Sequence, residues 1–359
     1  MKILVLGGTG AMGIHLVQLL SERGYNTYVT SRTGREPKNN IQFIKGNARN
    51  IDFISKLLEE KWDAIIDFMV YSTAEFEQRH RLFLQSAEQY IFISSARVYA
   101  DSIHPITEES PRLLDISKDV EYLSSDEYAL TKARQEDILQ NSGKTNWTII
   151  RPYITYSENR LQLGVLEKEE WLYRALHGKT IVFSKDIASK ITTLTYGFDV
   201  SKGIFAIIGN KKSLGQIFHI TSNESVTWQQ VIDIYLKVLE KYFEKKPKVL
   251  LQELKDFELW RPSKYQIYYD RLYNRKFDNT KIASFVDVQS YTILEEGLSK
   301  SIEKFIQNPT FANINWTAEA LKDKYTNEYT SLINIYGVKQ KFKYLVIRYF
   351  YRLYVLLKK

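Results

Sequence analysis

The most constraining feature of this sequence is a glycine-rich turn close to its amino-terminal end. Ile3–Leu6 is an apolar run too short for a helix and followed by glycines, so it predicts a buried parallel strand. Gly7, Gly10 and Gly13 then let the chain turn sharply, let backbone N–H groups approach a pyrophosphate and let the next segment pack closely. A helix is expected over 11–23, with its amino terminus facing the anion site. A tight turn without a ligand is the alternative.

Downstream, apolar segments alternate with helical patterns and place this turn in a larger sheet. Strands are expected over 26–31, 41–45, 64–70 and 90–95, with a helix over 51–61. Strands that alternate with helices form parallel sheets covered on both faces. The sequence therefore predicts an α/β fold built on a Rossmann-type, doubly wound parallel sheet.

Composition limits the class of protein. The 359 residues can bury a large core and are expected to form two lobes, and 44% hydrophobic with 26% charged residues is typical of a globular chain. The absence of cysteine excludes disulfides and thiolate metal sites and favours a reducing, cytoplasmic setting. The five histidines lack metal-ligand spacing, so no metal is expected. Neither a secretion signal nor a membrane-spanning helix is expected.

The net charge of +8 belongs mainly to the stretch Val338–Lys359, which contains seven Lys or Arg residues and no acidic residue. A net charge of only +1 remains for the rest of the chain. Because that body is nearly neutral, nucleic acid is not expected as a partner. The basic stretch predicts an amphipathic helix with Lys341, Arg348, Arg352 and Lys359 on one face. Two alternatives stay open, an anchor on anionic lipid at the inner face of a membrane and a helix packed on its own subunit or a dimer partner.

Ser31 and Arg32 end the second expected strand, where dinucleotide-binding folds recognise the adenosine ribose. An acidic residue at this point binds the ribose of NAD, whereas an arginine accommodates the 2′-phosphate of NADP. A hydroxyl and a guanidinium stand here without a carboxylate, so NADP(H) is the expected cofactor and NAD the alternative. A surface arginine in a solvated loop is the competing interpretation.

Hydroxyl-bearing side chains on two segments indicate a catalytic centre. Ser95 lies at the carboxyl end of the fifth strand, where open α/β sheets bind ligands. A polar segment over 101–127 is long enough to form a lip over that site. Tyr128 and Lys132 then lie four residues apart, on one face of an expected helix that Ser124–Ser125 would cap.

The chemistry of this trio is specific. A phenol with a pKa of about 10 is a poor acid or base at neutral pH. The ammonium of Lys132 favours the phenolate of Tyr128, and Ser95 can bond the same substrate oxygen. A nicotinamide at the sheet edge can then exchange hydride with the carbon that bears this oxygen. The same spacing recurs outside the cofactor lobe, at Tyr242/Lys246 and Tyr354/Lys358.

Five ordered motifs resemble the extended short-chain dehydrogenase/reductase family, which contains nucleotide-sugar epimerases, dehydratases and reductases. The motifs are Gly7–Gly13, Ser94–Tyr99, Tyr128–Lys132, Ile149–Pro152 and Gly215–Ile220. The resemblance implies that Tyr128 is the general acid/base, that Lys132 lowers its pKa and anchors the ribose, and that Ser95 positions the substrate oxygen. It also implies a homodimer formed through helices over 74–87 and 127–141.

The resemblance assigns binding residues as well. Cofactor contacts are expected from Gly7, Thr9, Gly10, Met12, Gly13, Ser31, Arg32, Asn47, Phe68 and Lys132. Substrate contacts are expected from Arg97, and from Arg261 and Arg275 at a nucleotide diphosphate, with intramolecular ion pairs as the alternative for the last two. Asn47, Phe68–Met69 and Ala100 depart from the family pattern, so we expect a reshaped cofactor pocket.

Three parts of the chain are expected. Residues 1–151 form the dinucleotide-binding domain, residues 152–310 a smaller α/β substrate lobe, and residues 311–359 a helical extension with the basic tail. A return of some lobe segments to the sheet is left open. Within the lobe, Thr227 and Gln230 are expected to cap a helix over 228–242.

The leading function is an NADP(H)-dependent reductase of a nucleotide-activated sugar, because Arg32 suits a cofactor that must be exchanged after each net reduction. A nucleotide-sugar epimerase with transient oxidation is the alternative enzyme. A 4,6-dehydratase is disfavoured because Ser95–Arg97 lacks the Thr-Asp-Glu of that group. The candidates from other classes are a catalytically silent binding protein, for which nucleic acid is one option as ligand, and a membrane-associated scaffold.

Overall fold

The computed structural model describes the backbone of residues 1–357 and the side chains of residues 1–351. It divides into two compact units, each made of several stretches of chain. Unit 1 contains residues 1–159, 192–225 and 274–297, and unit 2 contains residues 160–191, 226–273 and 298–359.

This division differs from the boundaries expected near residues 151 and 310. Residues 192–225 and 274–297 return to unit 1. One reason is that β11 (Gln216–Ile220) pairs in parallel with β6 (Trp147–Pro152) and becomes an edge strand of the sheet. The carboxyl-terminal extension is not a separate part, because it belongs to unit 2.

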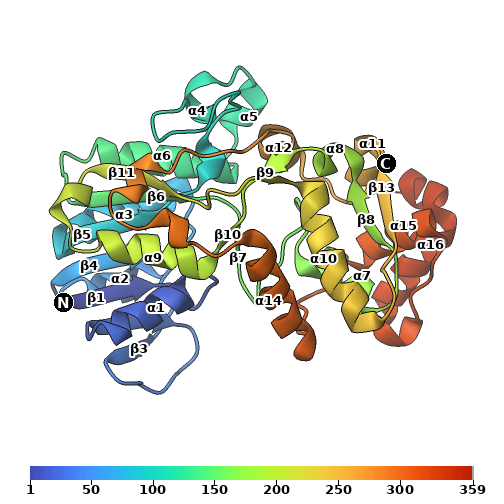
Figure 1. The fold of residues 1–359 in the computed structure, drawn as a ribbon, viewed down its shortest axis with the longest axis horizontal. Coiled ribbons are helices and arrows are strands. Elements are labelled where there is room, and N and C mark those ends of the chain that lie inside the picture. The colour runs from blue at the N-terminus through green and yellow to red at the C-terminus, as the bar shows by residue number, and fades with distance from the viewer. Residues whose placement is uncertain (358–359) are drawn as a thin grey trace. The chain divides into compact units, whose positions relative to one another are not determined.

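Unit 1 is built on a seven-stranded parallel sheet with the order β11-β6-β5-β4-β1-β2-β3 (Figure 1). The remaining strands are β1 (Lys2–Leu6), β2 (Asn26–Ser31), β3 (Ile41–Lys45), β4 (Trp62–Asp67) and β5 (Ala87–Ile93). The strand order reverses between β1 and β4, which is where doubly wound sheets bind ligands at their carboxyl edge. The predicted Rossmann-type sheet is therefore confirmed.

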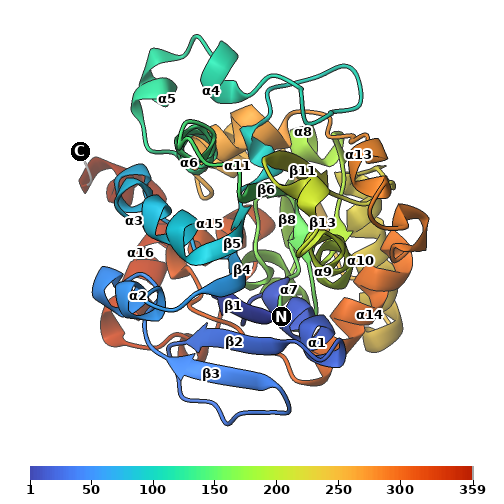
Figure 2. The same ribbon diagram turned by 90° about the vertical axis from the view of Figure 1, so that its left-hand side faces the viewer.

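Helices cover both faces of this sheet, as Figure 2 shows. One face carries α1 (Gly13–Glu22) and α9 (Gly197–Ile207), and the other carries α2 (Ile51–Leu57), α3 (Thr73–Ser86) and α6 (Tyr128–Gln140). Successive side chains of β1 supply the two cores in turn. Ile3 packs with Leu16 of α1, whereas Leu4 packs in the core that contains Phe76 of α3. Burial on both faces explains why β1 is a continuous apolar run from Ile3 to Leu6.

The expected lip is part of unit 1 and contains α4 (Leu113–Ile116) and α5 (Val120–Ser124). The N–H of Ile106 donates to the carbonyl of Lys276 at 2.8 Å. The carbonyl of Ile106 accepts from the N–H of Asp278 at 2.9 Å. The lip is thus tied to the segment that returns to unit 1. The remaining short elements of unit 1 are η1 (Ala96–Val98), β7 (Thr155–Tyr156), β10 (Thr195–Tyr196), η2 (Lys211–Ser213), α13 (Thr280–Ala283) and η4 (Val288–Ser290).

Unit 2 is mainly helical and contains a two-stranded parallel sheet of β8 (Ile181–Ser184) and β13 (Val249–Gln252). Its other elements are α7 (Lys168–Leu176), α8 (Lys185–Ala188), β12 (Val226–Thr227), α10 (Trp228–Phe243), α11 (Leu254–Glu258), α12 (Lys264–Gln266), η3 (Ile267–Arg271), α15 (Trp316–Thr326), η5 (Leu332–Asn334) and α16 (Val338–Leu357). Two elements, β9 (Ile191–Thr192) and α14 (Leu294–Gln307), span points where the chain passes from one unit to the other. Thr227 and Gln230 cap α10 reciprocally, as predicted.

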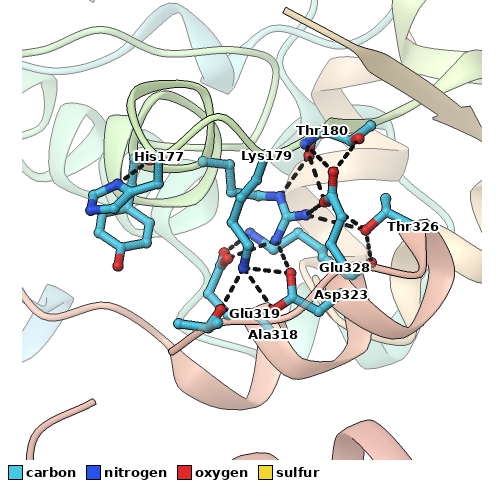
Figure 3. Close-up of polar contacts among 12 residues, drawn as sticks. His177, Lys179, Thr180, Ala318, Glu319, Asp323, Thr326 and Glu328 are labelled. Carbon is cyan, nitrogen blue, oxygen red and sulfur yellow. Dashed lines mark hydrogen bonds and ion pairs between the residues drawn. The ribbon is translucent and has the colours of Figure 1, made fainter. Parts of the chain in front are cut away.

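A buried ion cluster joins α7 and the following turn to the carboxyl-terminal helices of unit 2 (Figure 3). Its members are Arg174, Lys179, Glu319, Lys322, Asp323 and Glu328. The Arg174 guanidinium lies 2.8 Å from carboxylate oxygens of both Glu319 and Asp323. It lies 2.7 Å from Glu328, and Lys179 donates to Asp323 at 2.6 Å. Cations and carboxylates are equal in number, so the cluster carries no net charge.

The basic helix α16 packs along α15, which agrees with the second of the alternatives left open for the tail. Tyr344 and Ile347 are fully buried. The Tyr344 hydroxyl donates to Asp323 at 2.7 Å and accepts from the N–H of Thr330 at the same distance. The tail therefore contributes side chains to the core of unit 2.

The side chains of Phe342, Tyr349 and Phe350 are exposed, and α16 is kinked at Phe350, whose φ of −123° and ψ of 39° are not helical. Of the predicted basic stripe, Lys341 and Arg348 are described, whereas the side chains at positions 352 and 359 lie outside the described residues. None of the helices within residues 1–357 combines the length and apolarity needed to cross a bilayer.

Candidate active site

The glycine-rich turn joins β1 to α1, and its own geometry requires glycine at two of its positions. Gly7 has a φ of +72°, which side-chain-bearing residues rarely adopt. Its N–H donates to the Thr30 hydroxyl at 3.2 Å. A Cβ atom at Gly13 would lie 2.6 Å from the Cα of Gly8, so the first turn of α1 packs directly on the loop.

Gly10 is different, because a Cβ atom there would meet no protein atom within 4 Å. Thr9 and Gly10 are exposed just before the amino terminus of α1, where backbone N–H groups lack intrahelical partners. Bare backbone beside a helix amino terminus fits the close approach of a pyrophosphate. Met12 is half-buried, and its carbonyl accepts a hydrogen bond from Ser201 at 2.7 Å. The turn therefore suits the dinucleotide that the sequence predicts.

The ends of β2 and β3 offer polar groups but no carboxylate for an adenosine ribose. Ser31 is buried, and its hydroxyl lies 3.4 Å from that of Thr33. Arg32 is exposed and forms no ion pair within the part of the chain whose side chains are described. Asn47 is exposed two residues beyond β3, where its side-chain oxygen accepts from the N–H of Arg49 at 3.1 Å. A guanidinium at Arg32 thus remains available to a phosphate.

Phe68 and Met69 follow β4 and lie against the glycine-rich turn. A Cβ atom at Gly7 would be 3.0 Å from the Met69 sulfur and 3.5 Å from the Cβ of Phe68. Phe68 is partly buried on the core between the sheet and α1. These large side chains occupy space next to the turn, and a reshaped cofactor pocket stays a prediction.

Ser95, Tyr128 and Lys132 come from two neighbouring parts of unit 1. Ser95 lies just beyond the carboxyl end of β5, and its hydroxyl accepts from the N–H of Arg97 at 3.2 Å. Tyr128 is the first residue of α6, and Lys132 lies one helical turn further on. The start of α6 and the end of β5 therefore hold all three candidate catalytic residues.

The cap of α6 differs from the expected one. Glu127 accepts a hydrogen bond from the N–H of Ala129 at 2.7 Å, so it caps the helix in place of Ser124–Ser125. The two serine hydroxyls donate instead to carbonyls within α5. The hydroxyls of Ser124 and Ser125 therefore stabilise α5 at the end of the lip, not the start of α6 as expected.

Lys132 is only 1% exposed and is the most enclosed of the three side chains. Its ammonium donates to the carbonyl of Ile93 at 2.8 Å and lies 4.4 Å from the centre of the Phe92 ring. Burial lowers the pKa of Lys132 to about 8, while the charges of Asp67 and Glu136 oppose that shift. The carbonyl contact holds the ammonium at the end of β5, two residues before Ser95.

Tyr128 is half-buried, and the Arg97 guanidinium lies 5.4 Å from the centre of its ring. Arg97 also pairs with Glu127 at 2.6 Å. The ring of the candidate acid/base is therefore packed against Arg97, the residue expected as a substrate contact.

The other Tyr/Lys spacings do not form a comparable pair within the described residues. The helix α10 ends at Phe243, and Glu244 adopts a φ of 54°. Lys246 therefore does not share a helix face with Tyr242. Lys358 lies outside the described residues. Among the spacings that can be compared, only the one in α6 lies on a helix.

Arg275 has intramolecular partners in unit 1. Its side chain is fully buried, and it donates to the carbonyls of Tyr99 and Ala100 at 2.9 and 2.8 Å. The residue therefore braces the chain that follows η1. A phosphate contact of Arg275 stays a prediction.

Arg261 of unit 2 is partly exposed and has partners within that unit. It donates to the carbonyl of Val165 at 2.8 Å, and its Nε lies 3.2 Å from Glu170. This agrees with the intramolecular alternative, and a phosphate contact of Arg261 stays a prediction.

Asp67 was not predicted as a site residue, although it ends β4 at the ligand-binding edge. Its buried carboxylate accepts hydrogen bonds from the Tyr90 hydroxyl at 2.8 Å and from the Met69 N–H at 2.9 Å. Burial raises the pKa of Asp67 to about 6. A signal was available, because Asp67 is an acidic residue that directly follows the apolar run Ala64–Ile66. Asp67 is not part of a metal site, since no group of three or more His, Asp or Glu residues within the described chain could hold a metal ion.

A family model decides the assignment. The model of the NAD dependent epimerase/dehydratase family matches residues 3–221, which is more than half of the chain. The chain belongs to this family. The match includes the glycine-rich turn and all three candidate catalytic residues, and it confirms the resemblance to extended short-chain dehydrogenases/reductases.

Two relatives of this epimerase/dehydratase family member carry different names. The chain is 28% identical to the chloroplast stem-loop binding protein of 41 kDa b from Arabidopsis thaliana, over 63% of this chain and 60% of that protein. It is 22% identical to the 2′-dehydrokanamycin reductase from Streptomyces kanamyceticus, over 65% of each chain. The family member thus spans less than two thirds of the length of either relative.

Among solved structures, the family member resembles the UDP-glucuronic acid 4-epimerase from Bacillus cereus, crystallised in complex with NAD. The TM-score is 0.65 with 19% sequence identity, and the match covers 86% of this chain and 100% of that chain. At this identity the likeness shows the shared fold.

Proposed function

We propose that this family member is an NADP(H)-dependent oxidoreductase that reduces the keto group of a nucleotide-activated sugar. The observation that carries the proposal is a buried ammonium, Lys132, one helical turn from Tyr128 and at the strand end that leads to Ser95. Such an ammonium makes a phenol a usable proton donor near neutral pH. The similarity to a reductase supports the direction of reaction, and the fold shared with a UDP-sugar epimerase supports the substrate class.

In this proposal, each residue of the candidate active site has a defined role. Thr9, Gly10 and the first turn of α1 hold the pyrophosphate of the dinucleotide. Ser95 donates a hydrogen bond to the substrate carbonyl oxygen, and Tyr128 transfers a proton to that oxygen as it gains charge. Lys132 stabilises the resulting phenolate until Tyr128 regains a proton from solvent. The nicotinamide, when bound, supplies the hydride that reduces the carbonyl carbon.

An epimerase is the second enzymatic candidate, because the same side chains can remove the proton of a sugar hydroxyl and return it after transient oxidation. The nicotinamide, when bound, would take up hydride from the carbon that bears this hydroxyl and return it, without net reduction. The similarity to a stem-loop binding protein supports a third candidate, in which the fold binds nucleic acid and has no turnover. Mass spectrometry of the cofactor and nucleotide sugar retained by the purified protein separates these candidates. A keto sugar nucleotide that drives NADPH oxidation supports the reductase, whereas a protein that retains neither molecule and oxidises no NADPH contradicts it.

NADPH is expected to bind more tightly than NADH, because the exposed Arg32 can pair with a 2′-phosphate. Arg32→Ala is expected to weaken NADPH binding about 10- to 100-fold, the worth of a charge-assisted hydrogen bond, and to leave NADH binding nearly unchanged. Titration of the two reduced cofactors by fluorescence at moderate salt measures this preference.

Arg35→Ala is the matched control for Arg32, since Arg35 is another exposed arginine of the same loop. Its guanidinium lies 5.6 Å from the centre of the Phe43 ring. We expect this variant to keep most of the preference for NADPH. Equal wild-type affinities for the two cofactors would contradict the assignment.

The proposed enzyme is a cytoplasmic homodimer with α3 and α6 at its interface. Within one subunit these helices are already joined, because the Gln135 side chain of α6 donates to the carbonyls of Tyr71 and Ser72 beside the start of α3, at 2.8 and 3.2 Å. These hydrogen bonds fix α6 against the chain that enters α3. The absence of cysteine suits a reducing compartment.

We also propose that α16 makes a peripheral contact with anionic lipid. Phe342 is 70% exposed, and Tyr336, just before the helix, is 94% exposed. The seven Lys or Arg residues of Val338–Lys359 have no acidic neighbour in that stretch. Aromatic side chains among basic ones fit the interface of an anionic bilayer. Because α15 covers the opposite face, the contact leaves α16 packed on unit 2.

The full-length protein is therefore expected to sediment with phosphatidylglycerol vesicles and not with pure phosphatidylcholine vesicles. Rising salt should weaken the binding by screening. The double variant Phe342→Ser/Tyr349→Ser should lose most of it, whereas Ile103→Ser/Val120→Ser, on the exposed lip, is the matched control. Equal sedimentation of both variants would contradict a contact through α16. Truncation after Tyr336 is a poor test, since it removes the buried Tyr344 hydroxyl from Asp323.

A further inference from the structure

Asp67 and Lys132 are two oppositely charged side chains that are buried in unit 1. Asp67 ends β4, and the Lys132 ammonium contacts the last residue of the neighbouring strand β5. They are 0% and 1% exposed. A buried charge costs several kcal/mol, roughly, unless an opposite charge compensates it. The hydrogen bonds around each group identify which charge compensates Lys132.

Glu136, the other carboxylate that acts on Lys132, is already neutralised. Its oxygens accept from Nε and Nη2 of Arg151 at 2.9 and 2.7 Å. Nη1 of Arg112 lies 3.4 Å from the same carboxylate, and the Ser94 hydroxyl donates to it at 2.5 Å. Arg112 is shared with Asp115 and Asp137, each at 2.8 Å, but the bidentate pair with Arg151 by itself compensates the charge of Glu136 without Lys132.

Asp67 has donors but no cation among its hydrogen-bond partners. The donors are the Tyr90 hydroxyl at 2.8 Å, the Met69 N–H at 2.9 Å and the Tyr71 hydroxyl at 3.4 Å. Asp67 of β4 is paired in register with Phe92 of β5, and the Phe92 ring lies 4.4 Å from the Lys132 ammonium. The negative charge of Asp67 is therefore uncompensated except by Lys132.

We propose that Asp67 is the counter-charge that keeps Lys132 in its ammonium form and is thereby a positioning residue for Tyr128. This inference rests on the proposed function. The other titratable or charged groups around Asp67 are Tyr71, Tyr90, Glu136 of α6, and Glu75 and Arg79 of α3. Arg79 stacks 4.6 Å from the centre of the Tyr71 ring, and its guanidinium donates to backbone carbonyls. It therefore does not take the place of Lys132.

The expected effect on pH dependence follows from the signs of these interactions. Burial lowers the pKa of Lys132 to about 8 and the charge of Asp67 raises it, so loss of that charge must lower it further. Asp67→Asn keeps the size of the side chain and removes the charge. The alkaline limb of the kcat profile, where Lys132 loses its proton, should then move to lower pH by about one unit. NADPH binding should weaken over the same pH range.

NMR titration of the cofactor-free protein with ¹³Cε-labelled lysine tests the electrostatic pairing without turnover, and Lys132→Arg assigns the signal. We expect a wild-type Lys132 midpoint at about 8, with a smaller step at about 6 as Asp67 gains a proton. Asp67→Asn should lower the midpoint and abolish the step. Asp63→Asn, at an exposed position of the same strand, is the matched control and should change neither.

Tyr90→Phe keeps the test informative if Asp67→Asn does not fold. This variant retains the carboxylate and removes its shortest side-chain donor, so the step near pH 6 should move to higher pH. An unchanged Lys132 titration in the folded variants would overturn the pairing. A lowered Lys132 midpoint with an unchanged kcat profile would instead overturn the proposed function, so the two failures are distinguishable.

Discussion

Replacing Tyr128 with Phe is expected to lower kcat by about two to four orders of magnitude, the usual worth of a positioned proton donor. The phenyl ring keeps the packing at the start of α6 but cannot give a proton to the substrate oxygen. Cofactor binding should be retained, because the pyrophosphate surface at Gly10 is made by a different segment. Steady-state reduction of a keto sugar nucleotide and a parallel NADPH titration measure the two quantities.

Related variants show whether the loss is chemical. Lys132→Ala should lower kcat and also weaken NADPH binding, because the ammonium is proposed to serve both. Ser95→Ala should be milder, since it removes one hydrogen bond worth roughly 1 kcal/mol. Tyr242→Phe is the control, because this tyrosine of α10 is 54% exposed and its spacing to Lys246 runs past the helix end. Full activity of Tyr128→Phe on the true substrate would remove the basis of the mechanism.

Asp323→Ala is expected to destabilise unit 2 by about 3–5 kcal/mol, the usual cost of breaking a buried ion pair from one side. The change leaves Arg174 and Lys179 buried with fewer partners and removes the acceptor of the Tyr344 hydroxyl. Urea unfolding followed by circular dichroism should show the lower stability. If the unfolding transition separates into two steps, the loss of stability is confined to one of the two units.

An exposed pair of the same unit provides the comparison for Asp323. Lys185 and Glu253 lie 3.3 Å apart, with side chains 66% and 59% exposed. Glu253→Ala removes the same kind of charge but should cost at most about 1 kcal/mol, because water solvates the remaining lysine. If Asp323→Ala lowers stability no more than Glu253→Ala, the buried ion cluster does not hold the extension in place.

Local features were the ones that the sequence predicted best. The glycine-rich turn, the strand at Asn26–Ser31 and the Thr227 cap each depend on a few adjacent residues whose conformational preferences agree. Tyr128 and Lys132 were found because helical spacing brings positions four apart onto one face. In each case the information lies within one turn or one strand.

Long-range partners account for what the sequence did not predict. The backbone partners of Arg275 were not predicted, because nothing near it in the sequence indicates that its guanidinium reaches Tyr99 and Ala100. The serines before α6 were expected to be caps, but α5 uses their hydroxyls. Asp67 was not predicted, because the role proposed for it depends on which cations other side chains have already paired. Such facts are properties of packing between distant segments.

The five passages of the chain between the two units also affect how the protein is made. The glycine-rich turn and Lys132 belong to the first half of the chain to be synthesised, but the edge strand Gln216–Ile220 comes later. At about 5–20 residues per second, β6 waits roughly 3–14 seconds for its partner, and residues 274–297 come later still. During that interval the nascent sheet has an open, apolar edge. We therefore expect newly made chains to depend on a ribosome-associated chaperone, and a fragment ending at residue 151 to aggregate when expressed alone.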